Sequence, residues 1–152
     1  MAEFSYNPIQ LVQPGQNVLL NTTIGCNKGY VLHRNESGIV TLRGAVNNPN
    51  ACFARYQVTF NGNIAIPADG TVGPISVSLA IDGEPVQTSR AIVTPTAVDS
   101  YFNVTSTAIV TVPRCCCYTV AVENTSASAT PATTPAPEIN VQNANLTVTR
   151  IA

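Results

Sequence analysis

The sequence contains few charged residues, and it lacks any apolar run long enough to cross a membrane. Only 10% of its 152 residues are charged, there is one histidine, and tryptophan is absent. The seven Lys and Arg residues are scattered singly along the chain. A nucleic-acid partner requires a basic patch that neutralises phosphates, so we expect none. A transmembrane helix requires about 18 or more consecutive apolar residues. We therefore expect no membrane partner either.

The N-terminus has none of the features of a secretory signal. The first ten residues, MAEFSYNPIQ, include neither a basic stretch nor an apolar segment. We therefore expect the protein to be made in the cytoplasm of the cell that produces it. The five cysteines agree with that compartment, because an odd number with three of them consecutive is a poor disulfide framework.

Apolar residues, by contrast, make up 45% of the chain, whereas its charged fraction is well below the ~25% of an average soluble domain. The length suits one domain with one core. Two explanations of the low charge remain open. Either part of the surface is buried against copies of the chain or another protein, or the surface is covered by uncharged Thr, Ser, Asn and Gln side chains.

The sequence pattern predicts β-strands separated by turn residues and no amphipathic helix. In the longest segment, Ala54, Tyr56, Val58 and Phe60 alternate with polar residues, so we expect these four side chains to face the core. Asp82-Gly83 marks the clearest hairpin. We predict strands at residues 16–24, 30–33, 38–44, 52–66, 75–81, 86–93, 98–112, 116–123 and 139–151. This number of strands, many of them long, predicts an all-β fold, an antiparallel double-sheet jelly roll.

Two segments lack this pattern. Residues 1–15 form an N-terminal arm ahead of a single jelly-roll domain at residues 16–152. The arm is apolar without periodicity, so we expect it to be ordered only by lying on another surface. Its role stays open between anchoring to a larger particle, through Phe4, Tyr6, Leu11 and Val12, and packing along its own oligomer. Residues 124–138 are rich in Ser, Thr, Ala and Pro and predict an exposed loop.

Two further aromatic residues are candidates for contact with a partner. Phe53 and Phe102 are expected on strand faces that they share with polar residues. Large aromatic side chains in such positions often anchor protein interfaces. Packing in the core is an equally good explanation of both.

We predict no enzyme, no cofactor and no metal. His33 has no carboxylate and nucleophile that the sequence marks as its partners, so we expect it at the surface or in an interface. The acidic residues are isolated, and their spacing matches neither a calcium loop nor a glycosidase pair.

The three consecutive cysteines do not have the spacing of a metal site. Cys115 and Cys117 would share one strand face and Cys116 the other, unlike the CxxC pair of a zinc site. We favour small buried residues of a reduced protein. A zinc site shared across an oligomer axis and a disulfide between Cys26 and Cys52 remain alternatives.

Three runs of the sequence resemble a known fold family. They are VSLAIDGEPVQTSRAIV, TAIVTVPRCCCYTVAVENTS and the closing INVQNANLTVTRIA. They resemble the tumour-necrosis-factor-like (TNF-like) jelly roll of complement heads, and most closely the C-terminal domains of bacterial collagen-like spore-surface glycoproteins. The places of the family's hairpin, its proline turn and its closing apolar residues are occupied by Asp82-Gly83, Val112-Pro113 and Ile151-Ala152. The resemblance spans residues 52–152.

This resemblance implies a homotrimer. No Gly-X-Y repeat precedes the domain, so residues 1–15 stand where the family has a collagen stalk. Small proteins of this make-up also resemble those encoded among the structural genes of phages of gut Firmicutes, where such trimers serve as capsid decorations or head fibres.

The leading hypothesis is therefore a phage virion structural protein, a homotrimeric capsid decoration protein. It would be located in the virion and would bind the major capsid protein or another virion protein. The alternative is a carbohydrate- or receptor-binding head on a bacterial or spore surface. In that case the exposed loops, chiefly residues 124–138, would contact a host-surface glycan.

Overall fold

The computed structural model describes residues 1–25, 29–128 and 135–152 of the chain. Within these residues it contains strands and one short 3₁₀ helix, η1 (Gln87–Ser89). The strands of the first sheet, sheet A, are β1 (Ala2–Tyr6), β2 (Gln10–Val12), β3 (Thr22–Ile24), β6 (Phe53–Ala65), β10 (Phe102–Pro113) and β12 (Ile139–Arg150). The strands of the second sheet, sheet B, are β4 (Val31–His33), β5 (Ile39–Arg43), β7 (Ile75–Ile81), β8 (Glu84–Pro85), β9 (Ala91–Val93) and β11 (Cys117–Asn124).

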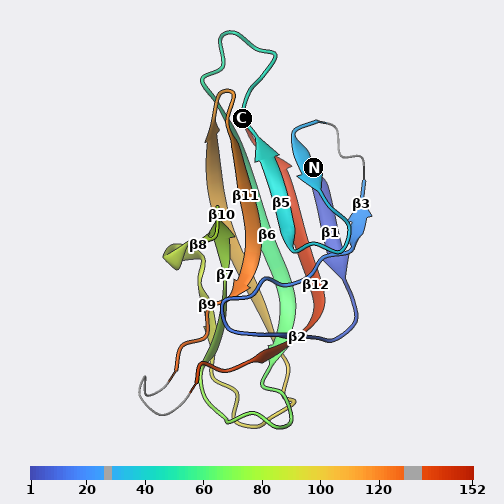
Figure 1. Ribbon diagram of the computed structural model, residues 1–152, viewed down its shortest axis with the longest axis vertical. Helices are drawn as coiled ribbons and strands as arrows, with labels where there is room; N and C mark the ends of the chain where they lie inside the picture. The colour runs from blue at the N-terminus through green and yellow to red at the C-terminus, as the bar shows by residue number, and fades with distance from the viewer. Residues whose placement is uncertain (26–28, 129–134) are drawn as a thin grey trace.

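The two sheets are antiparallel and pack face to face (Figure 1). Sheet A has the order β10-β6-β12-β1-β3, with β2 also paired to β12. Sheet B has the order β4-β5-β11-β7-β8, with β9 also paired to β7. This arrangement confirms the predicted all-β, double-sheet jelly roll.

The core lies between the sheets and takes alternate residues from each long strand. The four β6 residues that alternation assigned to the core are fully buried. The hydroxyl of one of them, Tyr56, donates hydrogen bonds to the backbone oxygens of Tyr30 and Arg43, so its burial leaves no polar group unpaired. Sheet B contributes Leu42, Val77, Leu79, Val120 and Val122 to the opposite side of the core.

Residues 1–15 are part of this domain, and the predicted separate arm is wrong. β1 pairs along its whole length with β12, and it pairs with β3 on its other side. Phe4 is 0% exposed and Val12 is 2% exposed, so both belong to the core. The two strands are only five and three residues long. Alternation over so few residues is too short to recognise in a sequence, although pairing with β12 and the burial of Phe4 and Val12 hold both strands in sheet A.

Two predicted strands are also broken in the structure. Of residues 16–24, only β3 is a strand, and the preceding residues run beside β11, where the Val18 N–H donates to the Val122 backbone oxygen at 2.7 Å. Residues 86–93 are interrupted by η1. There the Ser89 hydroxyl accepts a hydrogen bond from the Leu79 N–H at 3.0 Å, in the place of a neighbouring strand's backbone. A side chain that replaces a ladder bond cannot be read from alternation.

The long strands give the molecule two distinct ends (Figure 1). β6 has 13 residues, and at ~3.3 Å per residue such a strand spans about 40 Å. One end, here called the loop end, is formed by residues 66–74, 94–101, 125–128 and 135–138. The other, here called the thiol end, is formed by residues 43–55 and 113–117. Among the described residues, no helix has the length and apolarity to cross a membrane.

Candidate binding cleft at the loop end

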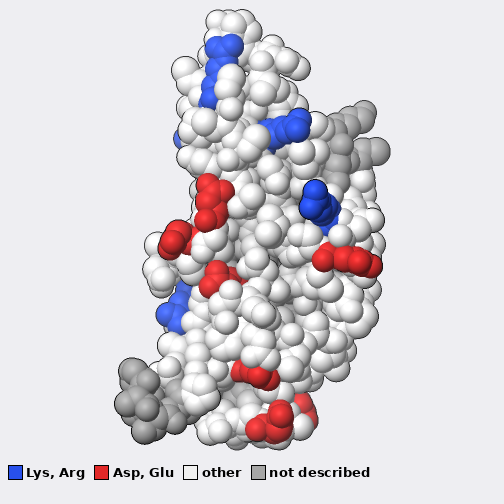
Figure 2. Space-filling view, in the orientation of Figure 1, with Lys and Arg blue, Asp and Glu red and all other residues white. Residues whose placement is uncertain are grey.

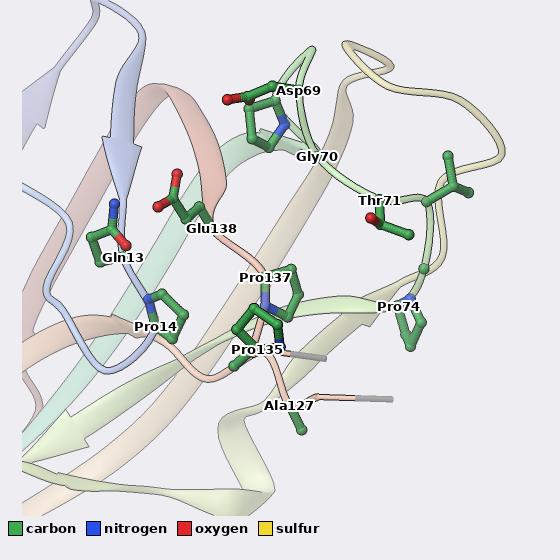
Figure 3. Close-up of a pocket in the computed structure, with 14 residues that line it drawn as sticks. Gln13, Pro14, Asp69, Gly70, Thr71, Pro74, Ala127, Pro135, Pro137 and Glu138 are labelled. Atoms are coloured by element: carbon green, nitrogen blue, oxygen red, sulfur yellow. The ribbon is translucent and has the colours of Figure 1, made fainter. Parts of the chain in front are cut away.

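A cleft of about 620 Å³ lies at the loop end, between the loop from β6 to β7 and the connection from β11 to β12 (Figure 3). The start of the irregular segment after β2 forms a further part of its wall. Its apolar surface is largely proline, contributed by Pro14, Pro67, Pro74, Pro135 and Pro137. Proline fixes its own φ angle, which restricts the backbone of these walls. The volume lies within the range of about 300–1,000 Å³ typical of small-molecule sites.

Polar groups of the cleft come from different segments of the chain. They are the carboxylates of Asp69 and Glu138, the amide of Gln13 and the hydroxyl of Thr71. Figure 3 shows the two carboxylates reaching from separate loops, with proline rings beside them. Carboxylates accept hydrogen bonds, whereas the amide and the hydroxyl both donate and accept. The cleft can therefore bind a ligand that presents several hydroxyl or amide groups.

A tight turn places Asp69. The Gly70 N–H donates to the Pro67 backbone oxygen at 2.8 Å, which closes the turn after β6. Aspartate is common in such turns because its short side chain bonds nearby backbone groups. The sequence identified Asp69 only as a turn former, and the structure adds that its carboxylate lines a cleft.

Asn124, the last residue of β11, holds the opposite wall. It is 1% exposed. Its Nδ2 donates to the backbone oxygens of Val12 at 2.9 Å and Pro137 at 3.1 Å, while its Oδ1 accepts from the Ser126 N–H at 3.0 Å. One amide side chain thus ties β2 to both described parts of the connection from β11 to β12. Asn124 was predicted to begin an exposed loop, and this is wrong for the residue itself.

A second set of polar contacts fixes the start of that connection. The Ser126 hydroxyl accepts from the Ser76 N–H at 2.9 Å. The Arg90 guanidinium donates to the Ser76 hydroxyl at 3.0 Å and to the Thr125 backbone oxygen at 2.6 Å. Because these bonds join the loop to β7, its first residues have a defined position beside the cleft.

Tyr101 and Phe102 also lie at the loop end, at the start of β10. Burial raises the pKa of the Tyr101 hydroxyl, and the Asp99 carboxylate raises that pKa further, whereas a hydrogen bond with Asn140 lowers it. The net shift of this pKa is upward. Phe102 pairs with Ile64 of β6 and remains 38% exposed.

The other predicted contact residues are spread over the molecule. Phe53 is 40% exposed but lies at the thiol end, a strand length away from Phe102. Leu11 is exposed and Tyr6 is half-buried, whereas Phe4 and Val12 belong to the core. The structure therefore does not bring the six predicted residues together. The proline-rich loops that form the cleft were visible in the sequence, but nothing in it showed that they meet.

The remaining candidates for chemistry lie elsewhere. His33 packs against the Phe4 ring with centroids 4.7 Å apart, and its Nε2 lies 2.9 Å from the Ser37 backbone oxygen. Among the described residues, no group of three or more His, Cys, Asp or Glu side chains is arranged to hold a metal ion. The pairing suggested for Cys26 and Cys52 falls outside the described residues, because Cys26 is not among them.

The fold and this cleft together define the class. The chain is a TNF-like double-sheet jelly roll with a proline-walled cleft among the loops of one end. Among solved structures it is similar to the globular domain of the zebrafish complement 1qA protein, with a TM-score of 0.55, 16% sequence identity, and coverage of 97% of this chain and 96% of that one. At this identity the similarity shows the fold, and it confirms the resemblance to complement heads.

Two further solved structures are more distant. They are the EclA C-terminal domain, described as a sugar-binding protein (TM-score 0.41, 14% identity, 95% of this chain and 79% of that one), and CBM35 from Cellvibrio japonicus Abf62 (TM-score 0.32, 18% identity, 94% and 97%). No protein-family model and no curated protein matches the sequence.

Proposed function

We propose that this chain is a homotrimeric binding head without catalytic activity, and that the loop-end cleft holds a carbohydrate of a surface receptor. The observation that carries the proposal is the cleft itself, with carboxylate, amide and hydroxyl groups set between proline-lined walls. A sugar presents several hydroxyl groups together with apolar C–H surface. The first would bond Asp69, Glu138 and Gln13, and the second would lie against the proline rings.

The size and shape of the cleft support one or two sugar units. Its volume of about 620 Å³ suits a small ligand, and its polar groups are few. Such an arrangement favours specificity for the pattern of ligand hydroxyl groups over high affinity.

A glycan array tests this proposal. The wild-type protein should bind a limited set of glycans, and the double variant Asp69→Asn, Glu138→Gln should bind them at least tenfold more weakly. Glu84→Gln is the matched control, because Glu84 is exposed on β8 and does not line the cleft. No binding to any glycan, or equal binding by the double variant, would refute the carbohydrate proposal.

We also propose that the head is displayed on a virion, as a capsid decoration bound to the major capsid protein or another virion protein. The outer face of sheet A supports an assembled protein of this kind. On β6 and β10 this face carries Thr, Asn and Gln side chains, exposed Phe53 and Ile109, and Arg55 as its one charged residue within those strands. An uncharged face with exposed apolar residues loses little hydration energy when it is buried against other chains.

Mass spectrometry of purified phage particles from the source tests the location. The protein should be present in the purified particles, and its copy number per particle should be a multiple of three. Its absence from all particles would refute the virion location, while leaving the glycan experiment as an independent test of the cleft.

A further inference from the structure

Four of the five cysteines are exposed, and they gather at the thiol end. Cys52 precedes β6, and residues 115–117 form the turn from β10 to β11. The prediction that the consecutive cysteines are small buried residues is therefore wrong. Cysteine is among the residues most often buried in soluble proteins, because an exposed thiol is open to oxidation. Four exposed thiols at one end of a small domain call for an explanation other than packing.

Backbone hydrogen bonds hold the segments that carry these cysteines side by side. The Arg114 N–H donates to the Cys52 backbone oxygen at 2.9 Å, and the Gly44 N–H donates to the Cys116 backbone oxygen at 2.8 Å. The Cys116 N–H donates to the Pro113 backbone oxygen at 3.1 Å, which closes the turn. The main chain thus defines the thiol end without any bond between sulfur atoms.

The conformation of Cys115 shows that the turn itself does not require this side chain. Its φ angle is +63°. This is the left-handed region, in which glycine is favoured and a side chain is strained. A cysteine at this position neither packs in the core nor favours the backbone conformation of the turn. It does present a thiol to solvent.

The two segments that carry these thiols are basic. Arg43 and Arg55 lie in residues 43–55, Arg114 lies in the turn, and these two segments contain no acidic residue. Figure 2 shows basic side chains and no acidic ones over this end of the visible face, whereas acidic side chains, together with further basic ones, lie over the rest of it. The hydrogen-bond partners of the three guanidinium groups are uncharged, since they are the Gly29 and Pro49 backbone oxygens and the Thr111 hydroxyl. A positive potential attracts small anions, including anionic disulfides such as oxidised glutathione.

We propose that the thiol end is a covalent cross-linking site, at which disulfides join copies of this chain after it leaves a reducing compartment. The proposal rests on the proposed homotrimer, because cyclic symmetry places an equivalent set of thiols on each of three copies. A cyclic trimer also points its three thiol ends the same way along the axis, so thiols that reach one another across that axis would react at a high effective concentration.

The oxidant is a small-molecule disulfide, and the reaction is thiol–disulfide exchange. A cysteine thiolate attacks oxidised glutathione, forms a mixed disulfide and releases one reduced glutathione. A cysteine of a second chain then attacks the mixed disulfide and releases the other. In sum, two protein thiols and one oxidised glutathione give one interchain disulfide and two reduced glutathione molecules.

The test uses the full chain purified under reducing conditions, both as wild type and with Cys26→Ser to remove the one cysteine that the structure does not describe. Each protein is treated with oxidised glutathione, blocked by alkylation and run on a non-reducing denaturing gel. We expect bands at two and three times the chain mass, with disulfide-linked peptides from residues 52 and 115–117. A chain that stays at its monomer mass, with only intrachain disulfides or glutathione adducts, would overturn the proposal.

The matched variant carries Cys52→Ser, Cys115→Gly, Cys116→Ser and Cys117→Ser. Glycine suits the backbone at position 115, so this variant should keep the wild-type melting temperature and should lose at least nine-tenths of the cross-linked bands. Undiminished bands would also overturn the proposal. Light scattering in reducing buffer measures the oligomeric state separately. A trimer that does not cross-link would refute the interchain disulfides but not the homotrimer. A monomer in reducing buffer would refute the homotrimer.

Discussion

At the scale of single residues, a few buried polar side chains decide where the loops lie. Asn124 is the clearest case, because one amide bonds backbone groups of β2 and of two parts of the connection from β11 to β12. Ser126 and Arg90 continue this network to β7. Each of these side chains satisfies backbone groups that would otherwise be buried without a partner. The cleft wall therefore depends on residues that do not face the cleft.

Asn124→Ala should destabilise the protein and weaken ligand binding together. The change leaves two backbone oxygens and one N–H without their partner, and buried unsatisfied groups cost about 1–3 kcal/mol each. After partial relaxation we expect a loss of about 2–3 kcal/mol in the free energy of unfolding, measured by denaturant titration.

Asn103→Ala is the control for that variant. Asn103 is also an asparagine, but it is exposed on the outer face of β10, where its side chain bonds Asn61 and Asn63. Its replacement should change stability by about 0.5 kcal/mol or less. Equal effects of the two substitutions would show that Asn124 does not hold the loop.

At the scale of elements, β1 decides how far sheet A extends. It lies between β12 and β3, so its backbone bonds both neighbours. Its inward residues, Ala2 and Phe4, complete the core beside His33. A segment in this position cannot leave the domain to bind a particle without exposing the edge of β12 and part of the core.

Phe4→Ala and Leu11→Ala test whether residues 1–15 pack in the core of this domain, which is neither of the two roles predicted for them. Phe4 is fully buried, and truncation of a buried phenylalanine costs about 3–5 kcal/mol. Leu11 is 52% exposed, so Leu11→Ala should cost about 0.5 kcal/mol or less. Thermal unfolding of both variants measures this difference, and a Phe4→Ala variant as stable as wild type would mean that β1 is not part of the core in solution.

At the scale of the whole molecule, the two ends and the two outer faces differ in chemistry. The loop end carries a cleft with carboxylates, and the thiol end carries exposed cysteines beside arginines. The outer face of sheet A is nearly uncharged, and its polar side chains bond one another across strands, as in the pairs Thr59–Thr107 at 3.2 Å and Asn61–Thr105 at 3.0 Å. Polar groups that already have partners can be buried in an interface at low cost.

Ile109→Asp should therefore convert the proposed trimer into monomers. Ile109 lies on the outer face of β10 and is 62% exposed, so a buried carboxylate would replace a buried methyl surface if this face joins the copies. The matched control is Ile92→Asp, because Ile92 is 63% exposed on β9 of sheet B. Light scattering in reducing buffer should give one chain mass for the first variant and three for the second, and a trimer from Ile109→Asp would exclude this face as the interface.

Alternation in β6 was sufficient to predict its core residues. Val58 and Phe60 are buried as their spacing required, and the same period of two holds for the buried Leu146 and Val148 of β12. The period of two repeats over strands of 13 and 12 residues, so a single exception does not hide it. The hairpin at Asp82-Gly83 was predicted equally well, since both residues have positive φ angles.

The sequence by itself therefore determined the fold class, because hydrophobic alternation, turn residues and the absence of helical periodicity all act locally along the chain. Only the tertiary structure decided which short segments join a sheet, that Asn124 is buried, that the proline loops enclose a cleft, and that the cysteines are exposed at one end. Each of these depends on residues far apart in the chain, for example Asn124 and Val12, which are separated by 112 positions. Contacts of that kind form only when the two sheets pack, and no periodicity along the chain records them.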